Sequence, residues 1–596
     1  MSNDTYDNID EINEFNSGTE NMNIIEYCNK LYNLTSWDKM IQIIRKQLFM
    51  INCPSNFKNT PYENKIIKIK YLEHNRLWKF QWARDCRGVI LYLNENNKIV
   101  PLKYQLQRGA EVLTNEHILK GINETDDFKI KNHDIFDIFD FNQQQVIIKL
   151  LKGEDIEGIL SSKCDGSLFA VTFYFDKYRT ILDEIINKYT NEFANIFYQM
   201  AKNQGHYCVP SSQGTFCLSD EMQSYNVTAV LGNEHDTNVL KMIRETNDNF
   251  KYAFKNYGMS WIVKICRIAD YLKSLYPNAI NITLNFESVC KNRLSMWDTT
   301  PHTELAIKYE RSFTSFLGAS VCEENYFKFV PHFDIKNLDE IDVYEPLYWR
   351  IKNAIQVNDI LRDLEYVINK EMSEEEYFNK HKPVNINKYK KFGCEIDMEG
   401  FVFLTINQSD ENNVYDYNKI KTLTYYKCHN FKESNVDCLI KISQISGNRF
   451  PLAVKVANFY SNLKEKLTKI SERLFNELDK PVENNLFFEK LSEKAKKNYC
   501  KHNKQNQIKI LINASENFST VCFNNFALEF PDIKKYESDT EKNTEIKQLV
   551  KTIIMAIEIW NFSNLEINID FILKQNSDKI KHINYLLLLC LKSPLV

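Results

Sequence analysis

The segment Ser162-Lys163-Cys164-Asp165-Gly166-Ser167-Leu168 places a lysine and an Asp-Gly pair just before an aromatic and β-branched run that reaches Tyr174. Such a run predicts a β-strand. Taken alone, a lysine before Asp-Gly is most often a solvated residue in a turn between strands, because Asp-Gly readily forms the backbone of tight turns. Its neighbours along the chain change that interpretation.

Four blocks accompany this segment in a fixed order. The upstream block brings an arginine and a glycine into a predicted strand, and the downstream blocks carry glutamates and then paired lysines. Each block is short and common, but the ordered combination is not. The blocks are Arg84-Asp85-Cys86-Arg87-Gly88-Val89-Ile90, Asn285-Phe286-Glu287-Ser288-Val289 with Lys291-Asn292-Arg293, Met398-Glu399-Gly400-Phe401-Val402, and Lys419-Ile420-Lys421-Thr422-Leu423-Thr424-Tyr425-Tyr426 with His429.

This ordered set resembles the RNA ligase 1 family, the phage-type ATP-dependent RNA ligases, within the covalent nucleotidyltransferases that also include DNA ligases and capping enzymes. The resemblance implies an α+β nucleotidyltransferase core with an ATP-grasp-like antiparallel sheet. It implies that 5′-phosphate and 3′-hydroxyl RNA ends are joined through a lysyl-AMP enzyme intermediate and an adenylylated RNA. The implied cofactors are ATP and Mg²⁺, with Mn²⁺ as an alternative, the implied partner is RNA, and the implied role is RNA repair, with broken tRNA as a substrate by analogy.

The expected catalytic residues follow from the resemblance and from the chemistry of phosphoryl transfer. Lys163 is the expected nucleophile, with Asp165 beside it. A lysine amine must be unprotonated to attack, and its ordinary pKa is about 10.4, so we expect burial and nearby cations to lower it. Lys419, Lys421, Arg87 and a bound metal ion would supply that charge and neutralise the phosphates as pyrophosphate leaves.

Two glutamates are the expected metal ligands, because Mg²⁺ prefers hard oxygen donors. By resemblance Glu399 is assigned to the metal and Glu287 to the ribose or the metal. Either glutamate alone would be taken for a solvent-facing residue of a strand.

The remaining expected nucleotide contacts are less well matched to the family. Gly166 and Gly400 are expected where the backbone approaches the nucleotide. Val402 and an aromatic such as Phe313 would form the adenine pocket, although ordinary core packing explains the aromatic equally well. The family lysine that contacts the triphosphate matches either Lys103 or Arg108, and a second family lysine, expected within residues 210–215, is missing.

Composition places the chain among ordinary water-soluble proteins. Of its 596 residues 43% are hydrophobic and 26% are charged, enough for several buried cores. Its apolar runs are too short to span a bilayer, and its 15 cysteines lack a C-x-x-C pair. We therefore expect an intracellular protein, cytoplasmic or nuclear, with no membrane partner; its richness in Asn, Lys and Ile is compatible with a viral source.

The pattern of apolar residues suggests three parts. Residues 1–20 are acidic, without Lys or Arg, and are predicted to form a disordered tail. Residues 21–435 show the α+β pattern of the ligase core, with a helical insertion at about residues 176–205. Residues 436–596 read as an all-helical C-terminal domain, a candidate RNA specificity module with lysine clusters at Lys464 to Lys469 and Lys494 to Lys504.

The secondary-structure pattern is clearest around the motifs. A hairpin is predicted from residues 89–93 through Asn94-Glu95-Asn96-Asn97 to Ile99-Val100. Further strands are predicted at residues 168–174, 280–286 and 401–404. Helices are predicted at residues 37–48, 178–202, 260–275, 451–478, 487–499, 544–560 and 571–591.

Two other functions remain open. A capping guanylyltransferase shares the Lys-x-Asp-Gly chemistry, and a catalytically inactive RNA-binding relative could retain the fold. The chain has no Gly-Lys dipeptide for a kinase phosphate loop and only His235-Asp236-Thr237 for a two-histidine phosphoesterase. End-healing kinase and phosphatase activities would therefore come from another protein, and the ligase is expected to be a monomer.

Overall fold

The computed structural model describes residues 16–112, 141–212, 258–289, 312–387, 398–429 and 491–501, apart from short gaps, and isolated positions elsewhere. These residues confirm the predicted α+β class, and their sheets are antiparallel except where β14 pairs with β5. No helix in these ranges is long and apolar enough to cross a membrane. The chain divides into two compact units, of which the first comprises Met1–Asp298, Thr303–His429 and Asn448–Phe450, and the second Thr299–His302, Asn430–Gly447 and Pro451–Val596.

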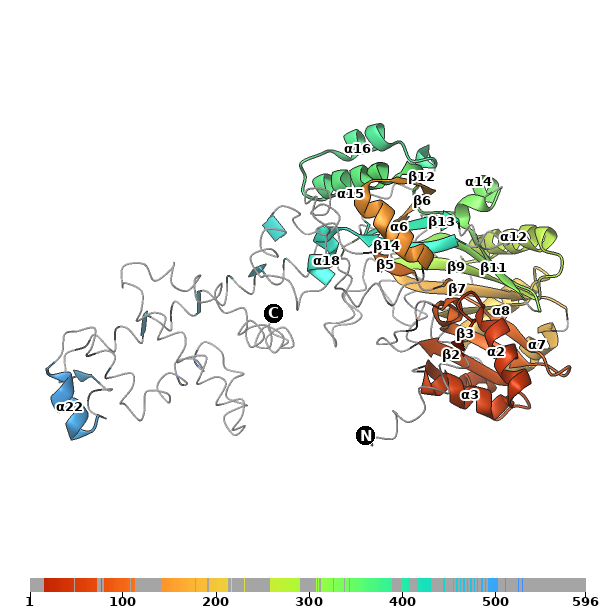
Figure 1. Ribbon diagram of the computed structural model, residues 1–596, viewed down its shortest axis with the longest axis horizontal. Coiled ribbons are helices and arrows are strands. Elements are labelled where there is room, and N and C mark those ends of the chain that lie inside the picture. Colours follow the sequence, from red (N-terminus) through yellow and green to blue (C-terminus); the bar gives the residue numbers. More distant parts are fainter. Residues whose placement is uncertain are drawn as a thin grey trace. The chain divides into compact units, whose positions relative to one another are not determined.

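A four-stranded sheet and the helices beside it form the N-terminal part of the first unit (Figure 1). Asn23 caps the first helix by accepting from the backbone N–H groups of Ile25 and Glu26, each at 2.9 Å. The predicted hairpin around Asn94 is confirmed, since β3 and β4 pair antiparallel. The sheet order is β1 (Phe49–Asn52), β2 (Ile66–Tyr71), β3 (Arg87–Leu93) and β4 (Ile99–Lys103), accompanied by α2 (Ile24–Leu34), α3 (Trp37–Lys46), η1 (Ser55–Phe57) and α4 (Gln81–Asp85).

Order in this part of the chain begins before residue 20. The Tyr27 hydroxyl donates to Asn16 Oδ1 at 2.8 Å, and Trp82 Nε1 donates to Thr19 Oγ1 at 3.2 Å. Asn16 and Thr19 are both buried. The predicted disordered tail is therefore wrong for residues 16–20, because polar side chains there find buried partners; residues 1–15 lie outside the described residues.

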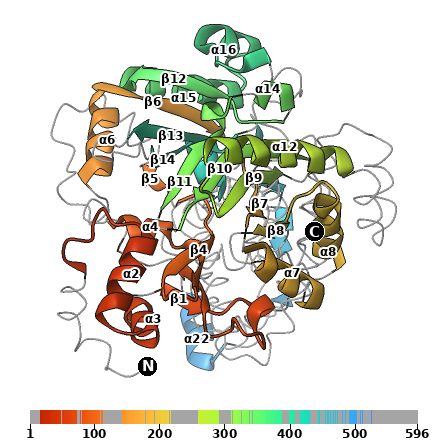
Figure 2. The same ribbon diagram turned by 90° about the vertical axis from the view of Figure 1, so that its right-hand side faces the viewer.

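The second sheet carries the strand predicted after Asp-Gly. Helix α12 runs along β9 (Figure 2), and Trp261 and Ile265 of the helix pack in one core with Phe169 and Phe286 of the sheet. The predicted helix at residues 178–202 forms two helices. The sheet order is β11 (Phe327–Pro331), β10 (Phe313–Cys322), β9 (Asn281–Val289), β7 (Ser167–Tyr174) and β8 (Cys208–Ser212), with α7 (Tyr178–Tyr189), α8 (Glu192–Lys202), α12 (Met259–Leu275), η5 (His332–Asp334) and α14 (Leu338–Ile341).

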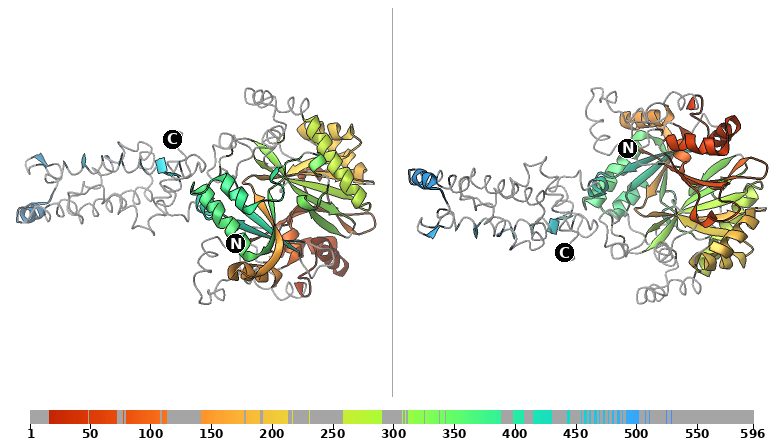
Figure 3. Two further views of the ribbon diagram at one scale, coloured as in Figure 1. Left: turned by 90° about the horizontal axis from the view of Figure 1, so that it is seen from above. Right: turned by 90° about the horizontal axis from the view of Figure 1, so that it is seen from below.

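The third sheet holds the remaining motifs. Helix α15 contacts β6, β12 and α6, whereas α12 lies over the second sheet (Figure 3). The order is β12 (Tyr348–Asn353), β6 (Asp155–Lys163), β13 (Gly400–Ile406), β14 (Tyr415–Lys421) and β5 (Ala110–Val112), with α6 (Phe141–Lys152), α15 (Ala354–Ile368), α16 (Glu374–His381) and α18 (Leu423–His429). Because β6 ends at Lys163 and β7 begins at Ser167, residues 164–166 connect the two five-stranded sheets.

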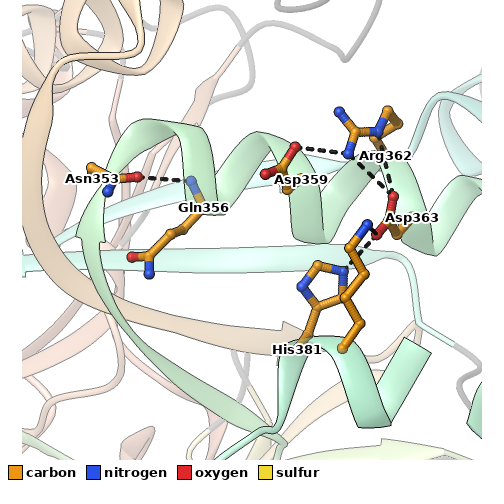
Figure 4. A network of polar contacts seen from close by, with 7 residues as sticks. Asn353, Gln356, Asp359, Arg362, Asp363 and His381 are labelled. Atoms are coloured by element: carbon orange, nitrogen blue, oxygen red, sulfur yellow. Dashed lines mark hydrogen bonds and ion pairs between the residues drawn. The ribbon is translucent and has the colours of Figure 1, made fainter. Parts of the chain in front are cut away.

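Buried charge joins α15 to α16. The side chain of Asp363 is 2% exposed and accepts from His381 Nε2 at 2.8 Å, and Lys380 Nζ lies 2.6 Å from the same carboxylate oxygen. Arg362 approaches its other oxygen at 3.4 Å and also pairs with Asp359 at 2.7 Å (Figure 4). One oxygen of the Asp363 carboxylate therefore faces Arg362 of α15, and the other faces Lys380 and His381 of α16.

Little of the second unit is described. Its helix α22 (Glu493–Tyr499) begins after Ser492, whose hydroxyl accepts from Ala495 N at 3.3 Å, and it falls within the helix predicted at residues 487–499. The boundary expected near residue 435 and the other helices predicted after it lie largely outside the described residues. The helical C-terminal domain stays a prediction.

Candidate active site

A cavity of about 480 Å³ lies within the first unit and is lined by strands of all three sheets. Its volume is in the range of small-molecule sites, about 300–1,000 Å³. One part of the wall is charged and another is apolar. The charged lining residues are Lys70, Arg87, Lys163, Glu287 and Lys419, and the apolar ones include Leu317, Phe329, Pro331, Phe333, Val402 and Leu404.

Strand pairing brings three sequence motifs to one sheet face. Lys163 lies directly opposite Gly400, and Ser161 lies opposite Val402. Val402 in turn lies opposite Lys419 of β14. Because alternate residues of a strand and directly paired residues share a face, these side chains all point to the cavity side of the sheet.

Lys163 meets a carboxylate. Glu399 Oε2 accepts from Lys163 Nζ, and Lys421 Nζ lies 3.5 Å from Glu399 Oε1. The backbone N–H of Glu399 also donates to the carbonyl of Lys163 at 2.7 Å, which fixes the two residues side by side. Each oxygen of this buried carboxylate therefore faces one lysine.

These charges govern the pKa of the candidate nucleophile. Burial lowers the pKa of Lys163, but the carboxylates of Glu399 and Glu287 outweigh burial and raise it above its usual value. The sequence-based expectation of a lowered pKa includes a bound metal ion, and in this arrangement of side chains alone the nearest charged group is the carboxylate of Glu399. Burial also opposes ionisation of Glu399, yet Lys163 and Lys421 hold the pKa of that carboxyl below its usual range.

Glu287 lines the cavity from the opposing sheet. Its strand neighbours are Leu168 on β7 and Ser315 on β10, directly opposite on either side. Burial raises the pKa of Glu287 to about 7, although Lys163 and Arg87 oppose this rise. Among the described residues, the buried Ser315 Oγ and Arg87 Nε also line the cavity and have no hydrogen-bond partner. Buried polar atoms are rarely left unpaired, so these two donors are suited to a polar ligand.

The described carboxylates near Lys163 offer few protein ligands for a divalent metal ion. No group of three or more His, Cys, Asp or Glu suitable for a metal occurs in the part of the chain that the structure describes. Mg²⁺ does not require one, because it keeps several waters and commonly uses one or two carboxylates with substrate phosphates. Glu399 and Glu287, coupled electrostatically through Lys163, can provide those carboxylates once Lys163 leaves Glu399.

Asp165 holds the connecting loop instead of lining the cavity. Its backbone N–H donates to the Tyr309 hydroxyl at 2.6 Å, and its carboxylate accepts from the Tyr425 hydroxyl at 3.1 Å and from Ile307 N at 3.4 Å. Tyr425 is itself positioned by α15, because Glu365 accepts from Thr424 N at 3.2 Å and from Thr424 Oγ1 at 2.7 Å at the start of α18. Asp165 therefore positions the loop that directly follows Lys163.

The two motif glycines are required by the protein itself. A Cβ atom on Gly166 would lie 2.6 Å from the carbonyl oxygen of Ser288 and 2.9 Å from Cγ of Glu287. Gly400 has a φ of +152° and its missing side chain would collide with the backbone of Ile420. Gly166 does line the cavity, but close strand packing already excludes a side chain at both positions. The two glycines are therefore no evidence for a bound nucleotide.

Two predicted nucleotide contacts lie away from the cavity. The Phe313 ring is buried between Tyr309 and Tyr344, with centroids 5.7 and 5.1 Å away, and the cavity aromatics are Phe329, Phe333 and Tyr417 instead. Lys103 is 1% exposed and its Nζ donates to the carbonyl oxygen of Ser212 at 2.7 Å, behind the cavity wall. These positions argue against both contacts. The Phe313 side chain packs against Tyr309 and Tyr344, and the Lys103 side chain bonds to Ser212, so neither faces the cavity.

Some predicted residues are not available for comparison. Arg108, Lys291, Asn292 and Arg293 and the side chain of His429 lie outside the described residues. One cation was missed by sequence reasoning: Lys70 of β2 lines the cavity and pairs with Arg87 of β3. Its signal was the alternation in Ile67-Lys68-Ile69-Lys70, typical of a strand with one polar face.

Neither a protein-family model nor a curated protein matches this chain. Its function is therefore inferred from the arrangement of its own residues.

Proposed function

We propose that the chain is an ATP-dependent RNA ligase in which Lys163 carries AMP. One observation carries the proposal: Lys163 lies at the wall of a cavity of nucleotide size that Arg87, Glu287 and Lys419 also line, from three strands far apart in sequence, and it pairs with Glu399, the residue just before β13. Chance placement of four motif residues near the Lys163 amine is improbable, and the resemblance to the RNA ligase 1 family explains the whole set.

The first step adenylylates the enzyme. The Lys163 amine leaves its ion pair with Glu399, loses a proton to solvent and attacks the α-phosphorus of ATP, so that a nitrogen–phosphorus bond forms while the bond to the bridging oxygen breaks and pyrophosphate departs. Lys70, Arg87 and Lys419 line the cavity and offer positive charge to the phosphates. Mg²⁺ held by Glu399 and Glu287 would supply further positive charge, which competes with Lys163 for these carboxylates.

Two further transfers complete the proposed ligation. The 5′-phosphate of one RNA end attacks the phosphorus of lysyl-AMP, which returns Lys163 as a free amine and leaves an adenylylated RNA. The 3′-hydroxyl of the other end then attacks the 5′-phosphorus and AMP departs. Holding both ends in line is the main contribution of the protein to these steps.

The substrate class is tested by parallel sealing assays. With ATP and Mg²⁺, the full chain is expected to join single strands that carry a 5′-phosphate and a 3′-hydroxyl when they are RNA and to join matching DNA poorly. Lys163→Arg, which keeps the charge but is a far weaker nucleophile, is the control and should seal neither. Sealing of DNA alone, or transfer of GMP to a 5′-diphosphate RNA end, contradicts the proposal.

A further inference from the structure

Ser161, His332 and Glu345 form a chain of buried polar side chains at the cavity wall. Ser161 Oγ lies 3.3 Å from His332 Nε2, and His332 Nδ1 lies 3.0 Å from Glu345 Oε2. The three residues are 6%, 3% and 8% exposed, and Ser161 and His332 both line the cavity. The transfer of AMP to Lys163 makes no use of them.

The acceptor-only carboxylate of Glu345 sets the direction of both hydrogen bonds. Because it accepts, His332 Nδ1 donates to it, and an imidazole that carries its one proton on Nδ1 has Nε2 as an acceptor. In this tautomer the Ser161 hydroxyl donates its proton to Nε2, which leaves only lone pairs on Oγ for the cavity. The rings of Phe333 and Tyr348, with centroids 5.2 and 5.5 Å from that of His332, limit how the imidazole can turn.

Ser161 also lies where the base of a nucleotide bound at Lys163 would reach. It stands two residues before Lys163 on β6, on the same face and about 6–7 Å away along the strand. Val402 is directly opposite it, and Phe333 and Pro346, the chain neighbours of His332 and Glu345, also line the cavity. Apolar lining residues with one oriented acceptor among them suit a purine edge.

We propose that His332 and Glu345 are positioning residues that hold the Ser161 hydroxyl as a hydrogen-bond acceptor for the 6-amino group of a purine. The inference rests on the proposed function and adds the basis of its nucleotide selectivity. Adenine offers an N–H donor at position 6. Guanine offers a carbonyl oxygen, which would face another acceptor and leave both groups unpaired in a buried site.

The contact is tested by adduct formation on Lys163 in the full chain. The probes are ATP, GTP and purine riboside triphosphate, which carries hydrogen in place of the 6-amino group. Wild type is expected to use ATP about fivefold to tenfold better than the purine analogue, the value of one neutral hydrogen bond, and on the order of a hundredfold better than GTP. In Ser161→Ala the preference for ATP over the analogue should fall to about one.

A matched control removes a hydroxyl outside the cavity. Ser211 is 1% exposed on β8, and its hydroxyl donates to the carbonyl of Ala170 at 3.5 Å. Ser211→Ala should keep the wild-type ratio of ATP to analogue, because its hydroxyl belongs to the strand pairing and not to the cavity.

The positioning role is tested by Glu345→Gln. A glutamine amide can donate to Nδ1, so the imidazole can take the other tautomer and donate from Nε2 to Ser161, whose proton is then free for a carbonyl oxygen. The ATP-to-GTP ratio should fall at least fivefold while adduct still forms on Lys163. A merely structural role for Glu345 would slow both nucleotides equally and leave the ratio unchanged, which overturns the inference.

The remaining outcomes separate the two proposals. An adduct that forms with no preference among the three nucleotides, or an ATP preference that persists in Ser161→Ala, overturns this inference alone. The absence of any adduct in wild type overturns the proposed function and this inference together. Circular dichroism checks each fold, and if Ser161→Ala fails to fold, the ratio measured in Glu345→Gln decides.

Discussion

Lys163 lies against Glu399, and this ion pair defines what the site must do before chemistry can begin. Both carboxylate oxygens of Glu399 face lysines, and the pKa of Lys163 is raised by Glu399 and Glu287 despite burial. The amine is thus stored as an ammonium ion close to its target. Any ligand that brings positive charge to Glu399 weakens this pair and favours the neutral amine.

Lys70 adds to the cavity a cation that none of the sequence motifs contains. It lines the cavity and pairs with Arg87 across β2 and β3. We expect Lys70→Ala to lower kcat/KM for adduct formation with ATP by about tenfold to a hundredfold, as loss of one cation from a phosphate site does. Single-turnover labelling over a range of ATP concentrations measures this change.

The control for Lys70 is its neighbour on the same strand. Lys68 is half-buried and does not line the cavity. Lys68→Ala should change kcat/KM less than twofold. Equal losses in the two variants would show that Lys70 acts through β2 and not on the phosphates.

At the scale of elements, strand pairing explains how much of the site the sequence predicted. The strands around Leu168, Phe286, Phe401 and the hairpin at Asn94 were predicted correctly, because each is a short aromatic or β-branched run bounded by turn residues. The strand register of β6 with β13 and of β13 with β14 then brings the motif residues of these three strands together. Phe313 does not line the cavity, and its ring packs beside Tyr309 and Tyr344, a contact with no local signal in the sequence.

The contacts missed by sequence join segments that are far apart. Ser161 and His332 are separated by 171 positions. Lys70 and Lys419 line the same cavity from two different sheets. Their neighbours are determined by how three sheets meet, and no periodicity within one segment encodes that meeting. The pKa of Lys163 depends in the same way on which of several charges lies nearest to its amine.

The buried carboxylate of Asp363 between α15 and α16 allows a test of how much one charged contact stabilises the fold. Burial raises the pKa of Asp363, but hydrogen bonds from Lys380 and His381 outweigh it and hold this pKa below its usual value. We expect Asp363→Asn to lower the free energy of unfolding by about 1–2 kcal/mol at pH 7. Since the folded-state pKa is lowered, this difference is present above the unfolded pKa of about 3.9 and should shrink as the pH falls through the folded pKa below it.

Urea unfolding followed by tryptophan fluorescence at neutral and acid pH measures this difference. Asp359→Asn is the matched control, because that carboxylate also pairs with Arg362 but is 38% exposed, and an exposed pair contributes less than about 1 kcal/mol (Figure 4). An Asp363 variant whose difference from wild type does not depend on pH would contradict the assigned charge.

At the scale of the whole molecule, charge is arranged locally. The formal net charge is −4, yet four cations line one cavity. The second unit offers another basic segment, because Lys494, Lys497 and Lys501, in and just after α22, are exposed. Nucleic-acid affinity depends on such placement more than on total charge.

If the second unit holds RNA, neutralising this segment should weaken substrate binding without affecting the first step. We expect the triple change of Lys494, Lys497 and Lys501 to Gln to lower RNA affinity and to reduce the slope of log K against log salt by about 2, at roughly 0.7 per phosphate contact on a single strand. Adduct formation on Lys163 should be unchanged, because it needs no RNA.

The control for this change neutralises exposed lysines of the first unit. Lys39→Gln with Lys46→Gln on α3 should leave the salt slope as in wild type. Fluorescence anisotropy of labelled RNA at several salt concentrations reports both quantities. A salt slope that is the same in the triple variant and in wild type would place RNA binding elsewhere.

The central claim is that Lys163 forms a covalent bond to AMP, and peptide mass spectrometry tests it most directly. The full chain is incubated with ATP and Mg²⁺, digested under conditions that preserve phosphoramidates, and compared with Lys163→Arg. The predicted result is one AMP on the peptide that contains Lys163 in wild type and none in the variant. AMP attached to another residue, or a wild-type chain that binds ATP and remains unmodified, would contradict the account.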